Sequence, residues 1–234
     1  MVAGMKYRHE LKYVVTAVQM ALLESRIRNL ISLDSHAGEE GSYRIRSLYF
    51  DDRYHSCYLE NEIGTDPREK FRIRIYNGDP GRISLELKRK EHGMTQKIAC
   101  PLTKEQCLEL MAGKPLPVDA SYASVLQKFN LLVRTRGMGP AVIVEYDRVP
   151  YVDRLGNVRV TLDRNIASSQ AVSAFLDPEI SRRPVMPAGQ HILEVKYDEF
   201  LPDYIYRNLQ IPGLQQTAFS KYYLCRRFSQ RGIL

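Results

Sequence analysis

The sequence contains no tryptophan and only four cysteines among its 234 residues. The cysteines form no C-x-x-C pair, and they are far sparser than in a disulfide-stabilised domain. We therefore expect reduced thiols and a cytoplasmic location. The first residues have no apolar signal core, and no apolar run approaches the ~20 residues that a membrane helix needs. No membrane segment is expected in this chain.

Several common ligand-binding motifs are also missing. There is no G-x-x-x-x-G-K-[ST] and no G-x-G-x-x-G, so a nucleotide would not be held by a P-loop or a Rossmann turn. The five histidines show no metal-ligand spacing, and the aromatic stacking motif of RNA-binding domains is absent. We expect no nucleic-acid partner. The net charge of +7 nevertheless indicates an anionic partner of some kind.

The pattern of apolar residues and turns predicts a single α+β domain over residues 1–234. Two capping boxes, Thr16 with Gln19 and Thr103 with Gln106, mark the starts of two helices. Strands are expected at 6–14, 43–51, 54–61, 70–77, 82–91, 95–101, 141–150, 157–164 and 190–198. Helices are expected at 17–32, after Thr103, and at 121–133, 202–209 and 218–229. Mostly antiparallel hairpins connect the strands, so we expect a curved or closed β-barrel with helices packed outside.

Charged residues alternate with apolar residues in several of these strands. Alternation places Arg72 and Arg74 on one face of their strand, and it does the same for Glu86, Lys88 and Lys90. One such face is commonly just solvated. Like charges on neighbouring strands repel, however, and several basic strands together favour a site for a polyanion. The acids on the same faces, Glu10 among them, either pair with these bases or hold a divalent metal.

The order of these motifs resembles the catalytic domain of the vacuolar transporter chaperone (VTC) family. The resemblance runs from about residue 6 to 228, and it depends on order and spacing rather than on any single motif. It is carried by Arg8-x-Glu10-x-Lys12-Tyr13, Lys70-Phe71-Arg72-Ile73-Arg74-Ile75-Tyr76, Leu85-Glu86-Leu87-Lys88, Lys97, Tyr146-Asp147-Arg148, Arg159-Val160-Thr161-Leu162-Asp163, Leu193-Glu194-Val195-Lys196 and Phe219-Ser220-Lys221-Tyr222.

The resemblance implies a CYTH-like triphosphate tunnel, an antiparallel closed barrel around a basic channel. The implied activity transfers the γ-phosphoryl group of ATP to a growing inorganic polyphosphate chain, with Mn²⁺ or Mg²⁺. The catalytic residues would be Arg72, Arg74, Lys88, Arg148 and Lys221. Substrate would also be bound by Lys12, Lys97, Tyr146, Arg159, Lys196 and Ser220. Glu194 would hold the metal, with Glu86 and Glu10 nearby.

One departure from the wider family affects the choice of reaction. CYTH enzymes usually open with Glu-x-Glu-x-Lys, whereas this chain has Arg8-x-Glu10-x-Lys12. A base replaces one metal-binding acid, which argues against a typical triphosphate hydrolase and favours the VTC branch. Hydrolysis in the same fold and a non-catalytic polyphosphate- or nucleotide-binding module remain alternatives. Alternation also turns Glu145 away from Tyr146 and Arg148, so Glu145 is not counted among the site residues.

Overall fold

The computed structural model of the protein describes residues 7–231. Its strands are β1 (His9–Thr16), β2 (Ser32–Leu33), β3 (Tyr43–Asp51), β4 (Arg68–Tyr76), β5 (Asp79–Glu91), β6 (Met94–Leu102), β7 (Gly139–Asp153), β8 (Val158–Ser169), β9 (Arg183–Pro184) and β10 (Gln190–Tyr197). Its helices are α1 (Ala17–Ile27), α2 (Ser56–Glu62), α3 (Lys104–Met111), α4 (Ser124–Arg136), α5 (Asp203–Leu209) and α6 (Lys221–Arg231).

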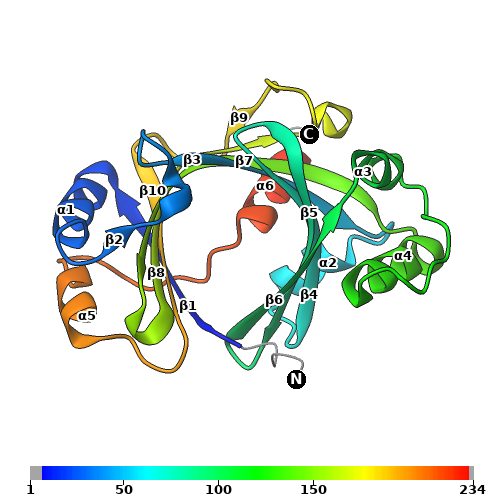
Figure 1. Cartoon of the computed structure of the whole chain (residues 1–234). Coiled ribbons are helices and arrows are strands. Elements are labelled where there is room, and N and C mark those ends of the chain that lie inside the picture. Colours follow the sequence, from blue (N-terminus) through cyan, green and yellow to red (C-terminus); the bar gives the residue numbers. More distant parts are fainter. Residues whose placement is uncertain (1–6, 232–234) are drawn as a thin grey trace.

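The strands form one antiparallel sheet in the order β1-β10-β8-β7-β3-β4-β5-β6, with β2 beside β7 and β9 beside β8. The sheet curls until its two ends meet just before β1, where Arg8 and Thr95 exchange two backbone hydrogen bonds of 2.9 Å. Figure 1 shows the strands surrounding a central space, with α1, α3, α4 and α5 outside the ring of strands and α6 within it in this view. The predicted α+β fold with a curled antiparallel sheet is confirmed, and this backbone bridge joins its two ends.

The apolar face of the sheet points outward, against the helices. On one side α4 places Phe129 against Phe50 and Phe71, with ring centroids 4.9 Å apart in both pairs. A second apolar cluster lies where α1 and α5 cover β8 and β10, and it includes Leu23 and Ile205. The charged side chains of the same strands therefore face the central space.

The predicted strand over 54–61 is wrong, because this segment forms helix α2. Two carboxylates at the end of β3 satisfy the amides of the first turn. Asp51 accepts from the N–H groups of Cys57 (2.9 Å) and Tyr58 (3.2 Å), and Asp52 accepts from that of Ser56 (3.0 Å). Carboxylates at a helix N-terminus stabilise that helix. Because they come four to seven residues before the amides they bind, the alternation of the segment itself did not reveal them.

Other differences concern the ends of elements. The helix predicted over 17–32 ends at Ile27, and Ser32–Leu33 instead pairs with β7 as the short strand β2. The helix predicted over 121–133 lies at Ser124–Arg136. All four cysteines are buried thiols, as expected. Within residues 7–231 no helix is both long and apolar enough to cross a membrane.

Replacing Phe129 with alanine tests the outward core. Phe129 is fully buried between two other rings, so Phe129→Ala should lower the free energy of unfolding by about 3–5 kcal/mol. Urea denaturation measures this change. The matched control is Lys128→Ala on the same helix, because Lys128 makes only a surface ion pair with Glu69 and should cost about 0–1 kcal/mol. Equal stabilities of the two variants would contradict the packing of α4 described above.

Candidate functional site

A cavity of about 560 Å³ occupies the central space of the curled sheet. Among the described residues, thirteen cationic side chains line it, against two carboxylates. The cations are Arg8, Lys12, Arg68, Lys70, Arg72, Arg74, Lys88, Lys90, Lys97, Arg148, Arg159, Lys196 and Lys221, and the carboxylates are Glu10 and Glu194. All the site residues predicted from the sequence line this cavity except Glu86.

The C-terminal segment reaches the cavity because it is fixed to β1. The N–H of Thr217 donates to the Lys12 carbonyl oxygen (2.8 Å), and Lys12 Nζ donates to the carbonyl oxygen of Phe219 (2.9 Å). One turn later, the Tyr222 hydroxyl donates to Asp51 at the end of β3. Ser220 and Lys221, at the start of α6, are therefore held against strands from the first half of the chain.

Glu194 lies among cations on the wall formed by β1 and β10. Its carboxylate oxygens are 2.5 Å from Lys196 Nζ, 3.6 Å from Lys12 Nζ and 3.8 Å from an Arg148 nitrogen. Burial alone would raise the pKa of Glu194, but these cations outweigh burial and hold the pKa well below its usual range. Glu194 is therefore ionised at neutral pH.

Glu10 lies beside Glu194 and has the same character. Both of its oxygens accept from Lys88 Nζ, at 2.7 and 2.9 Å. Lys12 and Lys196 each lie 3.5 Å from it, so the same two lysines contact both carboxylates. Burial opposes ionisation, yet Lys12 and Lys88 lower the pKa of Glu10.

Glu86 belongs to a different cluster and lies behind the cavity lining. It accepts from Arg72 through two nitrogens, at 2.8 and 2.6 Å, and lies 3.6 Å from Arg74. Lys97 Nζ donates to its other oxygen at 3.1 Å. The Glu86 side chain is 3% exposed, and Arg74, Arg72 and Lys97 lower its pKa against the effect of burial. Glu86 thus fixes cations of the wall.

Asp163 is a buried member of the site that the sequence reasoning did not single out. It forms a bidentate ion pair with Arg148, at 2.6 and 2.7 Å, and accepts from Lys221 Nζ at 2.6 Å. The ring of Tyr146 lies below both cations, 5.3 Å from Arg148 Cζ and 4.7 Å from Lys221 Nζ. Burial would raise the pKa of Tyr146, but Arg148, Arg74 and Lys221 lower it.

Lys70 is a second residue that the prediction left out. It donates to Asn61 of α2 and lies 3.3 Å from Ser220 Oγ, and no carboxylate among the described residues contacts it. Burial, and then Arg68 and Lys12, lower the pKa of Lys70 to about 7. The sequence did contain a signal for Lys70, because its spacing of two places it on the same strand face as Arg72 and Arg74.

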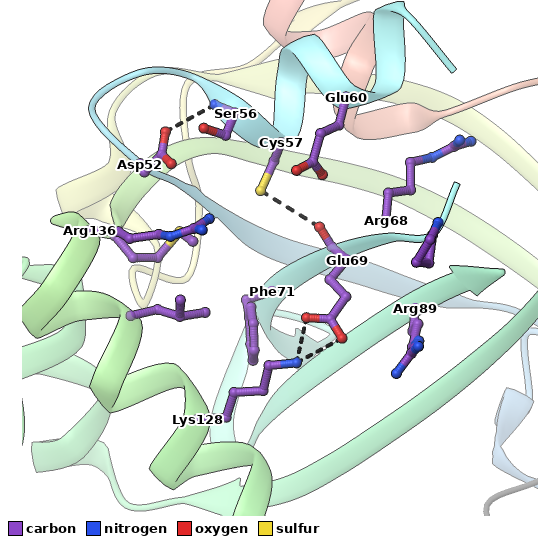
Figure 2. A pocket seen from close by; sticks show the side chains of 13 residues that line it. Asp52, Ser56, Cys57, Glu60, Arg68, Glu69, Phe71, Arg89, Lys128 and Arg136 are labelled. Atoms are coloured by element: carbon purple, nitrogen blue, oxygen red, sulfur yellow. Dashed lines mark hydrogen bonds and ion pairs between the residues drawn. The ribbon is translucent and has the colours of Figure 1, made fainter. Parts of the chain in front are cut away.

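A smaller cavity of about 380 Å³ lies outside the sheet, between α2, α4 and β4 (Figure 2). Its charges are largely offset locally. Lys128 pairs with Glu69, and Asp52 is occupied by the backbone amides of α2. The central cavity instead has a large excess of one sign, so we take it as the candidate site.

A divalent metal fits the central cavity under one condition. Among residues 7–231, no three His, Cys, Asp or Glu side chains meet in an arrangement that could hold a metal alone, and Glu86 does not join Glu10 and Glu194. Mg²⁺ needs only one or two carboxylates when phosphate oxygens and water complete its shell. Glu194 with Glu10 meets that need, but the lysines around them repel a bare cation. The metal should therefore enter together with phosphate.

Comparison with known proteins agrees with this geometry. A family model described as the VTC domain matches residues 7–229. No curated protein matches the chain significantly in sequence. A Hippeastrum protein, provisionally named an adenylyl cyclase and described as having a dominant triphosphatase activity, superposes with a TM-score of 0.51 at 14% identity, over 96% of each chain. A Bacillus halodurans protein provisionally named an adenylate cyclase gives 0.50 at 13% identity, over 88% of this chain and 87% of that one. At these identities the likeness shows the fold alone.

Lys70 gives the tunnel a testable pH dependence. With a pKa of about 7, Lys70 is charged below pH 7 and loses its charge above it. An anion binds the charged form better, so above pH 7 its binding is accompanied by uptake of a proton from solution onto Lys70. Tripolyphosphate affinity should fall between pH 7 and 9, by up to about tenfold per pH unit from this group.

Calorimetry in buffers of different ionisation enthalpy measures the proton uptake. Lys70→Arg is the matched control, because arginine stays charged throughout this range. Tripolyphosphate itself titrates, so the informative quantity is the difference between wild type and Lys70→Arg. Identical proton uptake by the two proteins would contradict the assignment.

Proposed function

The chain belongs to the VTC domain family, and from this premise we propose that it is a polyphosphate polymerase. It would transfer the γ-phosphoryl group of ATP to the end of an inorganic polyphosphate chain inside the tunnel. The observation that carries this proposal is the lining of the cavity, in which thirteen cations face two ion-paired carboxylates. Such an excess of charge within a closed sheet suits an anion that threads the cavity.

The arrangement of the cations along the strands favours an extended anion. On β4 the residues Arg68, Lys70, Arg72 and Arg74 occupy successive inward positions. A strand rises about 3.3 Å per residue, so these four side chains start along a line of roughly 20 Å. A single phosphate would contact only part of this row, whereas a chain of phosphates contacts all of it.

Phosphoryl transfer requires positioning and charge neutralisation rather than covalent catalysis. Arg72 is already fixed by Glu86 and by the Tyr49 hydroxyl, 2.8 Å from its other terminal nitrogen. Preorganised donors of this kind stabilise the charge that spreads over the equatorial oxygens, because they need no reorganisation during the reaction. Arg74, Arg148 and Lys221 contribute further fixed charges around the transferring group.

The state of the carboxylates favours a phosphate acceptor over water. Glu10 and Glu194 are both ion-paired with lowered pKa values, so each is a weak proton acceptor at neutral pH. The cavity histidine, His9, stacks on Tyr197 with ring centroids 4.8 Å apart. The end of a polyphosphate chain is already ionised and needs no general base. Hydrolysis would need a group to activate water.

Glu194, with Glu10 beside it, would hold the Mn²⁺ or Mg²⁺ ion that accompanies ATP. When bound, the ion would supply positive charge that offsets the charge of the phosphates. The residues of the chain have separate tasks. Lys12, Lys97 and Lys196 would bind the phosphate chain, with Arg159 and Lys88 beside them on neighbouring strands, and Tyr146 and Ser220 would contact phosphate oxygens.

Incubation of the protein with ATP and Mn²⁺ tests the proposed reaction. We expect inorganic polyphosphate to form with release of one ADP for each phosphate added. Gel electrophoresis detects the chains, and a malachite-green assay measures free phosphate. Free phosphate equal to the ADP released, without chains, would assign hydrolysis instead. Tripolyphosphate binding without any ADP release would leave only a binding module.

Glu194→Gln tests the metal assignment. The variant should lose metal-dependent turnover by about 100-fold or more, because the charge stabilisation from a bound metal is worth several kcal/mol. Metal-free tripolyphosphate binding should persist or become tighter, since one negative charge leaves a basic cavity. Turnover and calorimetric binding are measured together.

Glu69→Gln is the matched control, because Glu69 lies on β4 but faces outward to Lys128. It should keep both turnover and binding. Wild-type turnover in Glu194→Gln would show that Glu194 serves only as a partner of Lys196.

A further inference from the structure

We propose that Asp163 is a positioning residue of the tunnel, which holds Arg148 and Lys221 where they grip the transferring phosphate. The inference deepens the proposed function and rests on it for its kinetic part. Asp163 does not line the cavity and is fully buried, so it would act through these two cations rather than by contact with ligand.

The geometry of Asp163 explains how two distant parts of the chain share one anchor. Arg148 faces Asp163 directly across the β7–β8 ladder, which allows the bidentate ion pair at 2.6 and 2.7 Å. Lys221 comes from the start of α6 and contacts Oδ2 of the same carboxylate at 2.6 Å, an oxygen that Arg148 also contacts. Each cation keeps under a tenth of its side chain exposed, and that part opens into the cavity. A single carboxylate thus sets the spacing of Arg148 and Lys221.

Asp163 also affects the charge state of Lys221, and a comparison with Lys70 makes this effect visible. The groups facing Lys221 are Asp163 on β8, Tyr146 and Arg148 on β7, and Glu194 on β10, with Cys225 on its own helix. Burial opposes the charge of Lys221, but Asp163, then Tyr146 and Glu194, raise its pKa above the ordinary value. Lys70 is only partly buried, but it contacts no carboxylate of residues 7–231, and its pKa is lowered to about 7. Without Asp163, Lys221 should come to resemble Lys70.

The opposite face of the sheet provides a matched control. Arg46 and Glu145 form a cross-strand pair on β3 and β7 with a contact of 2.5 Å, and both are almost fully buried. Neither residue lines the cavity. Neutralising Glu145 therefore removes the charge of another buried, ion-paired carboxylate, without changing the charge that faces the ligand.

The experiment compares Asp163→Asn, Asp163→Glu and Glu145→Gln in the full chain. Three quantities are measured: the melting temperature, the affinity for tripolyphosphate without metal from pH 6.5 to 9, and kcat and KM with ATP and Mn²⁺. We expect lower melting temperatures for both Asp163→Asn and Glu145→Gln. Only in Asp163→Asn should Lys221 titrate within this pH range. Loss of its charge should weaken tripolyphosphate binding by up to about tenfold per pH unit above the midpoint of that titration.

The kinetic readout separates positioning from simple binding. Asp163→Asn should lower kcat by about 100-fold, the cost of displacing reacting groups by about 1 Å, while KM at pH 6.5 changes little. Glu145→Gln should keep the wild-type kcat and pH profile. The inference is overturned if Asp163→Asn matches Glu145→Gln in both.

Asp163→Glu keeps the test decisive if Asp163→Asn does not fold. It retains the charge and should keep the wild-type pH profile, but its longer side chain displaces both cations and should lower kcat. Wild-type kcat in Asp163→Glu would count against positioning. If the wild-type protein shows no turnover with ATP, the proposed function fails, and the pH profile of tripolyphosphate binding still decides whether Asp163 holds the charge of Lys221.

Discussion

Repulsion among cations confined to one cavity is the constraint on which the rest of this structure depends. Thirteen basic side chains face a space of about 560 Å³, and buried like charges destabilise a fold unless something offsets them. Glu10, Glu194, Glu86 and Asp163 provide much of that offset from two depths, and Asp198 and Asp34 pair with the lining residues Arg8 and Arg159. Glu10 and Glu194 lie in the lining, while Glu86 and Asp163 lie behind it. Each contacts at least two cations, so the acids divide the basic wall into fixed groups.

The same constraint explains why the sheet is polar inside and apolar outside. A charged inner face cannot form a core, so the hydrophobic stabilisation must come from the outer face. Helices α3 and α4 cover one part of that face, and α1 and α5 cover another (Figure 1). Most hydrophobic packing therefore lies outside the tunnel, although Tyr43, Ile45 and Tyr146 both line the cavity and belong to the core.

Much of this arrangement follows from local sequence patterns. The period of two in Lys70-Phe71-Arg72-Ile73-Arg74 is enough to assign one charged and one apolar face, and capping boxes are enough to start α1 and α3. The errors have causes outside the period-two pattern of each strand. Helix α2 forms because Asp51 and Asp52 precede it, and the tunnel partners of Asp163 lie 15 and 58 positions away in the chain. Nothing local distinguishes a buried anchor such as Asp163 or Glu86 from an acid that faces a ligand.

The offset of charge is incomplete, and this incompleteness is what makes the cavity suited to an anion. Within the part of the chain that the structure describes, Lys70 contacts no carboxylate, and burial lowers the pKa of both Lys70 and Lys88 to about 7 even though Glu10 contacts Lys88. These groups therefore remain partly uncharged until an anion arrives. Arg72, by contrast, is always charged and is held in place by Glu86, and Lys221 keeps its charge because Asp163 is built into the fold behind it. Permanent anchors thus hold the cations that must be in place before the ligand binds, while the lysines without such anchors acquire full charge only with the ligand.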